Sequence, residues 1–192
     1  MAPAVDDART RASRARVLAA AAQILRADGY TGLTMERVAA ETGVAKTTVY
    51  RHWPTKAALC MDLYLEEAGR ELQDPDTGEV AKDLKRIVSA VVHLQTKTVA
   101  GAAFLGLIAE AQINPGSRGA FLAEFAARRR AITRTVLERG VRRGELRRDL
   151  DIDLVIDAIG GATTFRLLQG HAPLNARFAD ALVSLVLQGA AK

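Results

Sequence analysis

The sequence predicts an all-α protein with about nine helices, and three observations support this fold class. Alanine, leucine and arginine dominate the 192 residues, and all three residue types favour helices. Apolar residues recur at spacings of three and four, which is the period of a helix with one buried face. Alternating patterns of the kind that predict strands are almost absent. We therefore expect a short N-terminal group of helices followed by a larger helical part.

Capping and helix-breaking residues bound the expected helices. Gly29 and Gly43 can adopt the left-handed backbone conformation that ends a helix, and Thr34 can cap the helix that follows it. Pro54 breaks the chain before a longer helix, and Ser117 can cap another. The expected helical ranges are 8–27, 35–41, 45–52, 56–72, 80–99, 102–112, 117–140, 151 or 153 to 168, and 175–187.

Positive charge is concentrated near the N-terminus. The chain carries 27 Lys and Arg against 22 Asp and Glu, which gives a net charge of +5. Residues 1–60 hold nine of the basic residues and five of the acidic ones, so most of the excess lies in this first third. Such a distribution suits a domain that binds a polyanion, although four excess charges also occur in proteins that bind no nucleic acid.

The segment around Gly43 has the features of a helix-turn-helix. Ala39 is small where a second helix would cross closely, and Gly43 permits the turn four residues later. Val38, Val44 and Val49 provide apolar residues for the inner side. The outer face of the second helix would carry donors for phosphates and base edges, namely Lys46, Thr47, Thr48, Tyr50, Arg51 and His52. The spacing also fits an ordinary helical turn within a core, so on spacing alone both interpretations stay open.

The uninterrupted run from Gly29 to Leu59 resembles the N-terminal domain of the TetR/AcrR family of bacterial repressors. Trp53 stands where the family more often has Phe, and both rings fill the same kind of pocket. A weaker similarity extends to residues 106–112 and 170–174. The resemblance implies an all-helical homodimer with a three-helix DNA-binding domain and a larger C-terminal domain that senses ligand and dimerises.

The resemblance also implies that two parts of the chain have different functions. Residues 1–54 would form the helix-turn-helix DNA-binding domain, and residues 55–192 the ligand-binding and dimerisation domain. The function implied is that of a transcriptional regulator, and most members of the family are repressors. Such a regulator binds a palindromic operator as a homodimer and is released by a small-molecule effector. Its partners would be double-stranded operator DNA, a second copy of the chain and that effector. We expect no cofactor, no metal and no membrane partner.

Carried over by position, the resemblance implies eight DNA contacts: Thr34, Lys46, Thr47, Thr48, Tyr50, Arg51, His52 and Lys56. Lys46 begins the recognition helix, and Lys56 resembles a phosphate clamp that opens the fourth helix. Thr34 serves equally well as a cap alone, and His52 has a structural role as its alternative.

Arginines outside this segment allow two interpretations each. Arg9, Arg11 and Arg14 could form an arm that enters the minor groove, or a solvated tail. A second concentration of arginines over residues 128–148 could bind nucleic acid. Acidic residues interleave with it, however, which favours a solvated helix face with ion pairs between subunits.

Apolar residues in the C-terminal part suggest a ligand cavity and a dimer contact. The candidate cavity walls are Leu63, Val92, Phe104, Leu107, Ile108, Phe125 and Phe165, although such residues usually form plain core. Polar contacts inside the cavity could come from His93, Gln95, Gln112 and Glu110. The candidate dimer residues are Ile156, Gly160, Gly161, Leu182, Leu185 and Val186. The paired glycines would let another backbone approach, or would merely kink their helix.

Other classes of function find little support in the sequence. His52, His93 and His171 lack metal-ligand spacing, and Cys60, alone in the chain, excludes an internal disulfide framework. No phosphate-binding glycine loop or nucleophile motif is present, so an enzyme is least favoured. A helical adaptor that does not bind DNA is the other alternative. No apolar run is long enough to cross a bilayer, and the charged N-terminus is unlike a signal peptide, so we expect a cytoplasmic protein.

Overall fold

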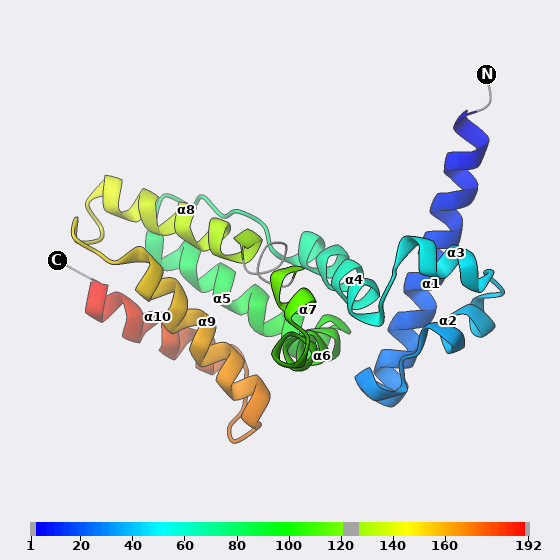
Figure 1. Ribbon diagram of the computed structural model, residues 1–192. Helices are drawn as coiled ribbons and strands as arrows, with labels where there is room; N and C mark the ends of the chain where they lie inside the picture. The colour runs from blue at the N-terminus through cyan, green and yellow to red at the C-terminus, as the bar shows by residue number, and fades with distance from the viewer. Residues whose placement is uncertain (1–2, 121–126, 191–192) are drawn as a thin grey trace. The chain divides into compact units, whose positions relative to one another are not determined.

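A computed structural model of the chain describes residues 3–120 and 127–190, and the regular structure within these ranges is α-helical throughout (Figure 1). This confirms the predicted fold class. The helices are α1 (Pro3–Gly32), α2 (Met35–Thr42), α3 (Lys46–His52), α4 (Lys56–Glu71), α5 (Val80–Lys97), α6 (Ala100–Ile113), α7 (Pro115–Ala120), α8 (Ala127–Arg143), α9 (Ile152–Gln169) and α10 (Ala176–Ala190).

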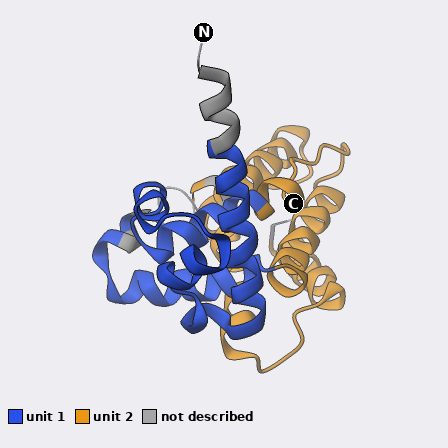
Figure 2. Cartoon of the chain, turned by 90° about the vertical axis from the view of Figure 1, so that its right-hand side faces the viewer, with its two compact units in different colours: residues 1–66, 99–119 blue, residues 67–98, 120–192 orange. Residues whose placement is uncertain are grey.

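The chain divides into two compact units (Figure 2). The first comprises residues 1–66 and 99–119, and the second residues 67–98 and 120–192. The first unit therefore continues past residue 54 and takes in most of α4 as well as α6. The expected boundary between residues 54 and 55 concerns function, and it stays a prediction.

Local sequence signals set the helix ends in the first unit. The Thr34 hydroxyl accepts a hydrogen bond from the backbone N–H of Arg37 at 3.1 Å and so caps α2. Gly43 ends α2 with a φ of 66°, a conformation that residues with a Cβ adopt only with strain. Gly29, with a φ of 67°, breaks the helical path inside α1 near the expected end of the first helix.

The first unit has a core to which α1, α2, α3, α4 and α6 contribute. Its most deeply buried side chains include Val17, Ile24, Leu33, Val38, Val49 and Leu59. Helix α6 lies against the end of α1, where a Cβ on Gly106 would come within 2.0 Å of the Tyr30 ring. Burial raises the pKa of the Cys60 thiol in α4 to about 12, so this thiol stays protonated at neutral pH.

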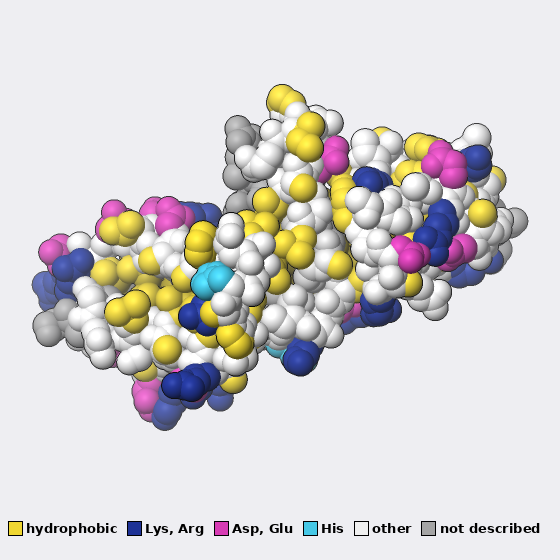
Figure 3. All heavy atoms as spheres, turned by 90° about the horizontal axis from the view of Figure 1, so that it is seen from below, with side chains coloured by type: hydrophobic (Ala, Val, Ile, Leu, Met, Phe, Trp, Pro, Cys, Tyr) yellow, Lys and Arg dark blue, Asp and Glu magenta, His cyan; other side chains and the backbone are white. Residues whose placement is uncertain are grey.

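The second unit consists of α5, α8, α9 and α10 around one apolar core. Helix α5 packs against α8 and α10, and α9 packs against the same two helices. The core includes Leu84, Val88, Val136, Leu137, Ile159 and Val183. Apolar side chains also gather on the outer surface of this unit, as the left half of Figure 3 shows.

Ion pairs within the second unit account for much of the arginine concentration in α8. Arg139 pairs with Asp74 and Asp76 in the loop before α5, and Arg130 pairs with Asp153 and Asp157 in α9. These pairs lie within one chain, and the expectation of ion pairs between subunits stays a prediction.

One predicted helix differs from the structure. The expected range 117–140 corresponds to α7 and α8, with residues 121–126 between them outside the described residues. Helix α7 begins at Pro115, a residue suited to a first helical turn, so Ser117 does not cap it. The Asn114 side chain accepts a hydrogen bond from the N–H of Gly116 at 3.0 Å.

In the described ranges, no helix taken singly has both the length and the hydropathy to cross a membrane.

Candidate nucleic-acid interface

The turn between α2 and α3 is held by short-range contacts. The Thr42 hydroxyl donates a hydrogen bond to the carbonyl of Val38 at 2.7 Å and accepts one from the N–H of Val44 at 3.3 Å. Val38, Ala39 and Val44 are buried on the inner side of the turn, as the spacing predicts. The two helices are thereby fixed at an angle with α3 on the outside.

Helix α3 is anchored at its end by a hydrogen-bonded triad, which consists of Trp53, Asp62 and Arg14. The indole N–H of buried Trp53 donates to one carboxylate oxygen of Asp62 at 3.0 Å. The other oxygen accepts from the Arg14 guanidinium at 2.6 Å. The triad joins α1, α4 and the end of α3, and sequence reasoning missed it.

Arg14 accordingly belongs to neither of the roles that the sequence suggested for it. Its ion pair with Asp62 is accompanied by a longer one to Glu66 at 3.5 Å, and the hydrogen bond to Asp62 raises the pKa of the guanidinium. It is thus a structural residue rather than part of an arm or a solvated tail.

The outer face of α3 is open to solvent. Lys46, Thr47, Tyr50, Arg51 and His52 are exposed and Thr48 is half-buried, while Val49 points inward and is buried. His52 is therefore not the buried structural histidine considered as its alternative. Three basic side chains and three hydroxyl groups, one of them on the half-buried Thr48, form an accessible surface suited to DNA.

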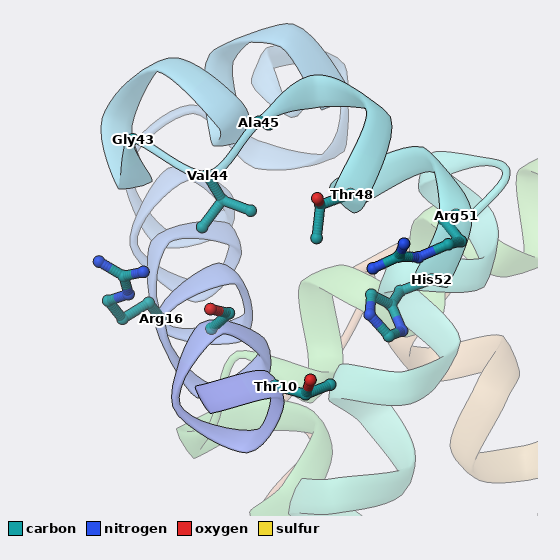
Figure 4. Close-up of a pocket in the computed structure, with 9 residues that line it drawn as sticks. Thr10, Arg16, Gly43, Val44, Ala45, Thr48, Arg51 and His52 are labelled. Atoms are coloured by element: carbon teal, nitrogen blue, oxygen red, sulfur yellow. The ribbon is translucent and has the colours of Figure 1, made fainter. Parts of the chain in front are cut away.

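A groove of about 450 Å³ runs between this face and α1. In Figure 4, Thr48, Arg51 and His52 of α3 lie across the groove from Thr10 and Arg16 of α1. Sequence reasoning missed the α1 side, although Thr10, Ser13 and Arg16 recur at a spacing of three, as residues on one helix face do.

Two further predicted DNA contacts are engaged within the protein. The Lys56 ammonium donates to the backbone carbonyl of Tyr30 at 3.2 Å and lies 4.1 Å from the centre of the Tyr30 ring. Lys56 is half-buried and does not line the groove. Thr34 is exposed, with its hydroxyl in the cap of α2.

Tyr50 is held by an acidic neighbour. Its hydroxyl donates a hydrogen bond to Glu36 Oε1 at 2.6 Å, across the gap between α3 and α2. This bond raises the pKa of Tyr50 and lowers the pKa of Glu36, so the pair is a neutral phenol beside a carboxylate at neutral pH.

Comparison with known proteins decides the family. Residues 17–62 match the family model described as bacterial regulatory proteins, tetR family, and residues 74–186 match a tetracyclin repressor-like C-terminal domain. The chain belongs to the TetR family. It is therefore a DNA-binding transcriptional regulator with a helix-turn-helix, and the family is one of regulators rather than enzymes.

Individual relatives agree with the TetR-family assignment. An uncharacterized HTH-type transcriptional regulator of Bacillus subtilis, YdeS, is 30% identical and covers 90% of this chain and 87% of its own length. The transcriptional repressor DrrR1 of Streptomyces coeruleorubidus is 45% identical over 33% of this chain and 24% of its own length. The crystal structure of the TetR family regulator SCO0332 is 37% identical, with a TM-score of 0.77 over 94% of this chain and 99% of that one.

The candidate cavity residues of this TetR-family chain fall in both units. Leu63, Phe104 and Leu107 are buried and Ile108 is half-buried in the first unit. Val92 belongs to the core of the second unit. Phe165 is 58% exposed, so it does not line an interior wall of the described chain. Phe125 lies outside the described residues.

The suggested polar cavity groups differ in their surroundings. Gln95 is 4% exposed, and neither atom of its amide has a hydrogen-bond partner among the described residues. Glu110 accepts a long hydrogen bond from the Tyr30 hydroxyl at 3.5 Å. His93 is exposed and lies 4.0 Å from Glu71.

The candidate dimer residues divide into two groups. Ile156 and Leu182 are each 7% exposed and belong to the core of their own unit, which leaves them no surface to offer a partner. Leu185 is 67% exposed and Val186 is half-buried. A Cβ added at Gly160 or Gly161 would meet no described atom within 4 Å apart from the backbone of its own helix. Leu154 and Leu168 are also exposed, and of these two sequence reasoning missed Leu154.

Proposed function

We propose that this chain is a cytoplasmic repressor that binds a palindromic operator as a homodimer and releases it when a small molecule binds the C-terminal part. Residues 1–54 would carry DNA binding and residues 55–192 sensing and dimerisation. The observation that carries the proposal is the solvent-exposed polar and basic face of α3, since the family assignment makes this helix the second of a helix-turn-helix.

In this proposal α3 enters the major groove of DNA. Lys46, Thr47, Thr48, Arg51 and His52 meet base edges and phosphates, and Tyr50 meets a phosphate. The groove between α3 and α1 accommodates the sugar-phosphate strand that borders the major groove, because its lining is polar and basic. Thr34 and Lys56 would add phosphate contacts from the starts of α2 and α4, and Lys56 would have to leave Tyr30 to do so.

Lys46→Ala tests the proposed DNA contacts. The operator is first recovered from a randomised pool as the duplex that the wild-type protein selects (the selected duplex). We expect Lys46→Ala to weaken binding about tenfold and to reduce the slope of log affinity against log salt by about 0.9, the contribution of one phosphate contact. Titrations at several salt concentrations measure both quantities.

Lys82→Ala provides the matched control, because Lys82 is an exposed lysine in the second unit that pairs with Glu79 at 2.5 Å. Its removal should leave both the affinity and the salt slope unchanged. Equal effects of the two substitutions, or no effect of Lys46→Ala, would refute the assignment of α3 to the DNA.

The proposed dimer contact uses the outer face of α9. Leu154, Gly161, Phe165 and Leu168 follow one another at spacings of seven, four and three, so they share one face of the helix. Ile156, which faces the opposite way, is buried in the core. Exposed apolar side chains gathered in one stripe favour association with a second apolar surface, and Leu185 on α10 adds another. Two copies of this face would make a symmetric contact.

The proposed effector site makes use of the unpartnered amide of Gln95 in α5. A buried amide without a hydrogen-bond partner is costly, and its retention in a protein calls for an explanation such as a ligand. A neutral amide offers one acceptor and two donor hydrogens, so the effector would carry a polar group that can both donate and accept. Binding would stabilise one conformation of the chain over the DNA-binding one.

Gln95→Leu tests whether the unpartnered amide lowers the stability of the protein. We expect the free energy of unfolding without ligand to rise by about 1–2 kcal/mol, because an unsatisfied polar group is replaced by an apolar one of similar size. Denaturant titration measures the change, with Gln23→Leu on the exposed side of α1 as the control. A fall in stability would mean that Gln95 is hydrogen-bonded in solution and would remove this support for an effector site.

A further inference from the structure

The hydroxyl of Tyr50, one of the proposed DNA contacts, is hydrogen-bonded to an acidic side chain. Glu36 lies in the first turn of α2, and its carboxylate accepts the Tyr50 hydroxyl at 2.6 Å. Both side chains are exposed, Tyr50 by 40%. The pair is therefore open to solvent, and Lys46 is close enough to act electrostatically on the carboxylate, so an anion at this position would be expected to weaken binding to DNA.

The two roles of the Tyr50 hydroxyl compete for a single proton. A phenol has one hydrogen to donate, and a DNA phosphate oxygen can only accept. While the hydrogen points to Glu36 it cannot point to a phosphate. A carboxylate and a phosphate oxygen are also chemically alike as charged acceptors, so Glu36 imitates the partner that Tyr50 would meet on DNA.

A capping box does not account for the contact of Glu36 with α3, although the carboxylate also interacts with its own backbone N–H in the first turn of α2. In a capping box the acidic residue stands three positions after the N-cap and bonds back to it, and here Thr34 is the N-cap and Arg37 holds that position. Glu36 gains some stabilisation from the helix dipole, but that interaction needs no contact with α3. Lys46 also acts electrostatically on the Glu36 carboxylate, so its charge affects two of the proposed DNA contacts.

We propose that Glu36 is an affinity-limiting residue of the DNA interface, acting as an intramolecular substitute for a phosphate on Tyr50. This inference rests on the proposed contact between Tyr50 and DNA. Binding requires the Tyr50 hydroxyl to leave the carboxylate and requires the carboxylate to lie near the DNA backbone. Both requirements weaken the complex, and they give the protein faster release from DNA than its cationic face alone would allow.

Glu36→Gln should strengthen binding to the selected duplex about tenfold, because it removes like-charge repulsion and leaves only a neutral acceptor beside Tyr50. The slope of log affinity against log salt should become steeper by up to about 0.9, since loss of the carboxylate raises the net positive charge of the interface by one. A random 30-base-pair duplex should show a gain in the same direction, because phosphates are present in every sequence.

A double-mutant cycle with Tyr50→Phe separates the proposed route from a general effect of charge. Glu36→Gln should gain much less affinity in the Tyr50→Phe background than in the wild type. Glu41→Gln is the matched control, since Glu41 is an exposed acid on the same helix that pairs with Arg37 at 2.9 Å; it should change affinity by less than twofold. Circular dichroism and thermal unfolding of every variant identify any loss of the fold.

The outcomes are distinguishable. If Tyr50→Phe leaves affinity unchanged, the proposed phosphate contact of Tyr50 fails and the inference fails with it. If Tyr50→Phe weakens binding but Glu36→Gln has no effect, the contact stands and the role of Glu36 is refuted. An equal gain from Glu36→Gln in both backgrounds also overturns the proposal. Weaker binding by Glu36→Gln overturns it too, because Glu36 would then contribute a favourable contact with DNA.

Discussion

Phe165→Glu combined with Leu185→Glu is expected to leave the chain folded and monomeric and to lower affinity for the selected duplex by about a hundredfold or more. Both side chains are largely exposed, by 58% and 67%, so the substitutions remove little from the core of the unit. A carboxylate placed inside an apolar contact between two copies loses its water without gaining a partner. Two DNA-binding domains that are no longer joined must each bind alone.

Sedimentation of the protein and titration of the selected duplex measure these two effects. Ala81→Glu serves as the control, because it adds a negative charge of the same kind, one in place of two, at an exposed position of α5 in the same unit. It should leave both the assembly and the affinity as they are in the wild type. A double variant that stays dimeric would exclude this face of α9 and α10 as the interface.

Gly106→Ala should lower the free energy of unfolding by about 2 kcal/mol or more, the cost of overpacking a core. A Cβ at this position would lie 2.0 Å from the Tyr30 Cδ2 atom and 2.2 Å from its Cγ atom, at the base of the ring. The ring cannot simply move away, because Lys56 lies 4.1 Å from its centre and its hydroxyl bonds to Glu110. Accommodating the methyl group therefore requires α6 or the end of α1 to shift.

Denaturant unfolding of Gly106→Ala in two backgrounds tests this contact. With Tyr30→Ala already in place, Gly106→Ala should cost little, because the atoms that the methyl group would meet are gone. The control is Gly69, an exposed glycine in a helix, where an added Cβ would meet no described atom within 4 Å apart from the backbone of its own helix. Gly69→Ala should therefore raise the free energy of unfolding slightly. The same loss from Gly106→Ala with and without the Tyr30 ring would refute the packing argument.

Short-range signals made the DNA-binding segment predictable. Thr34 at the start of α2, Gly43 in the turn and the apolar spacing of Val38 and Val49 each act within a few residues. Such signals place helix ends and buried faces directly. The all-α fold and the buried faces of α2 and α3 could therefore be predicted from local signals, whereas the helix-turn-helix and the DNA-binding role of α3 were predicted from the resemblance of residues 29–59 to a known family.

Long-range partners could not be predicted in the same way. Arg14 and Asp62 are 48 positions apart, and Arg139 and Asp74 are 65 positions apart. Nothing in the local pattern says which acid each arginine will meet once the helices pack. The same limitation hid the bond between Tyr50 and Glu36, because it joins two helices whose relative angle is set by the turn.

The apolar character of α9 explains the mixed outcome for the dimer candidates. Helix α9 carries apolar residues on two opposite sides, and periodicity alone does not say which side faces its own core. The structure assigns Ile156 and Ile159 to the core and leaves Leu154, Phe165 and Leu168 exposed. The choice depends on the packing of α8 and α10, which the sequence of α9 does not contain.

The most direct test of the central claim changes the spacing of the operator. If two copies of α3 lie in successive major grooves, the wild-type protein should select a palindromic duplex and saturate it at two chains per duplex. Inserting five base pairs between the half-sites turns one to the opposite side of the helix, and affinity should fall to that of a random duplex. Binding that survives the insertion, or saturates at one chain per duplex, would contradict the account.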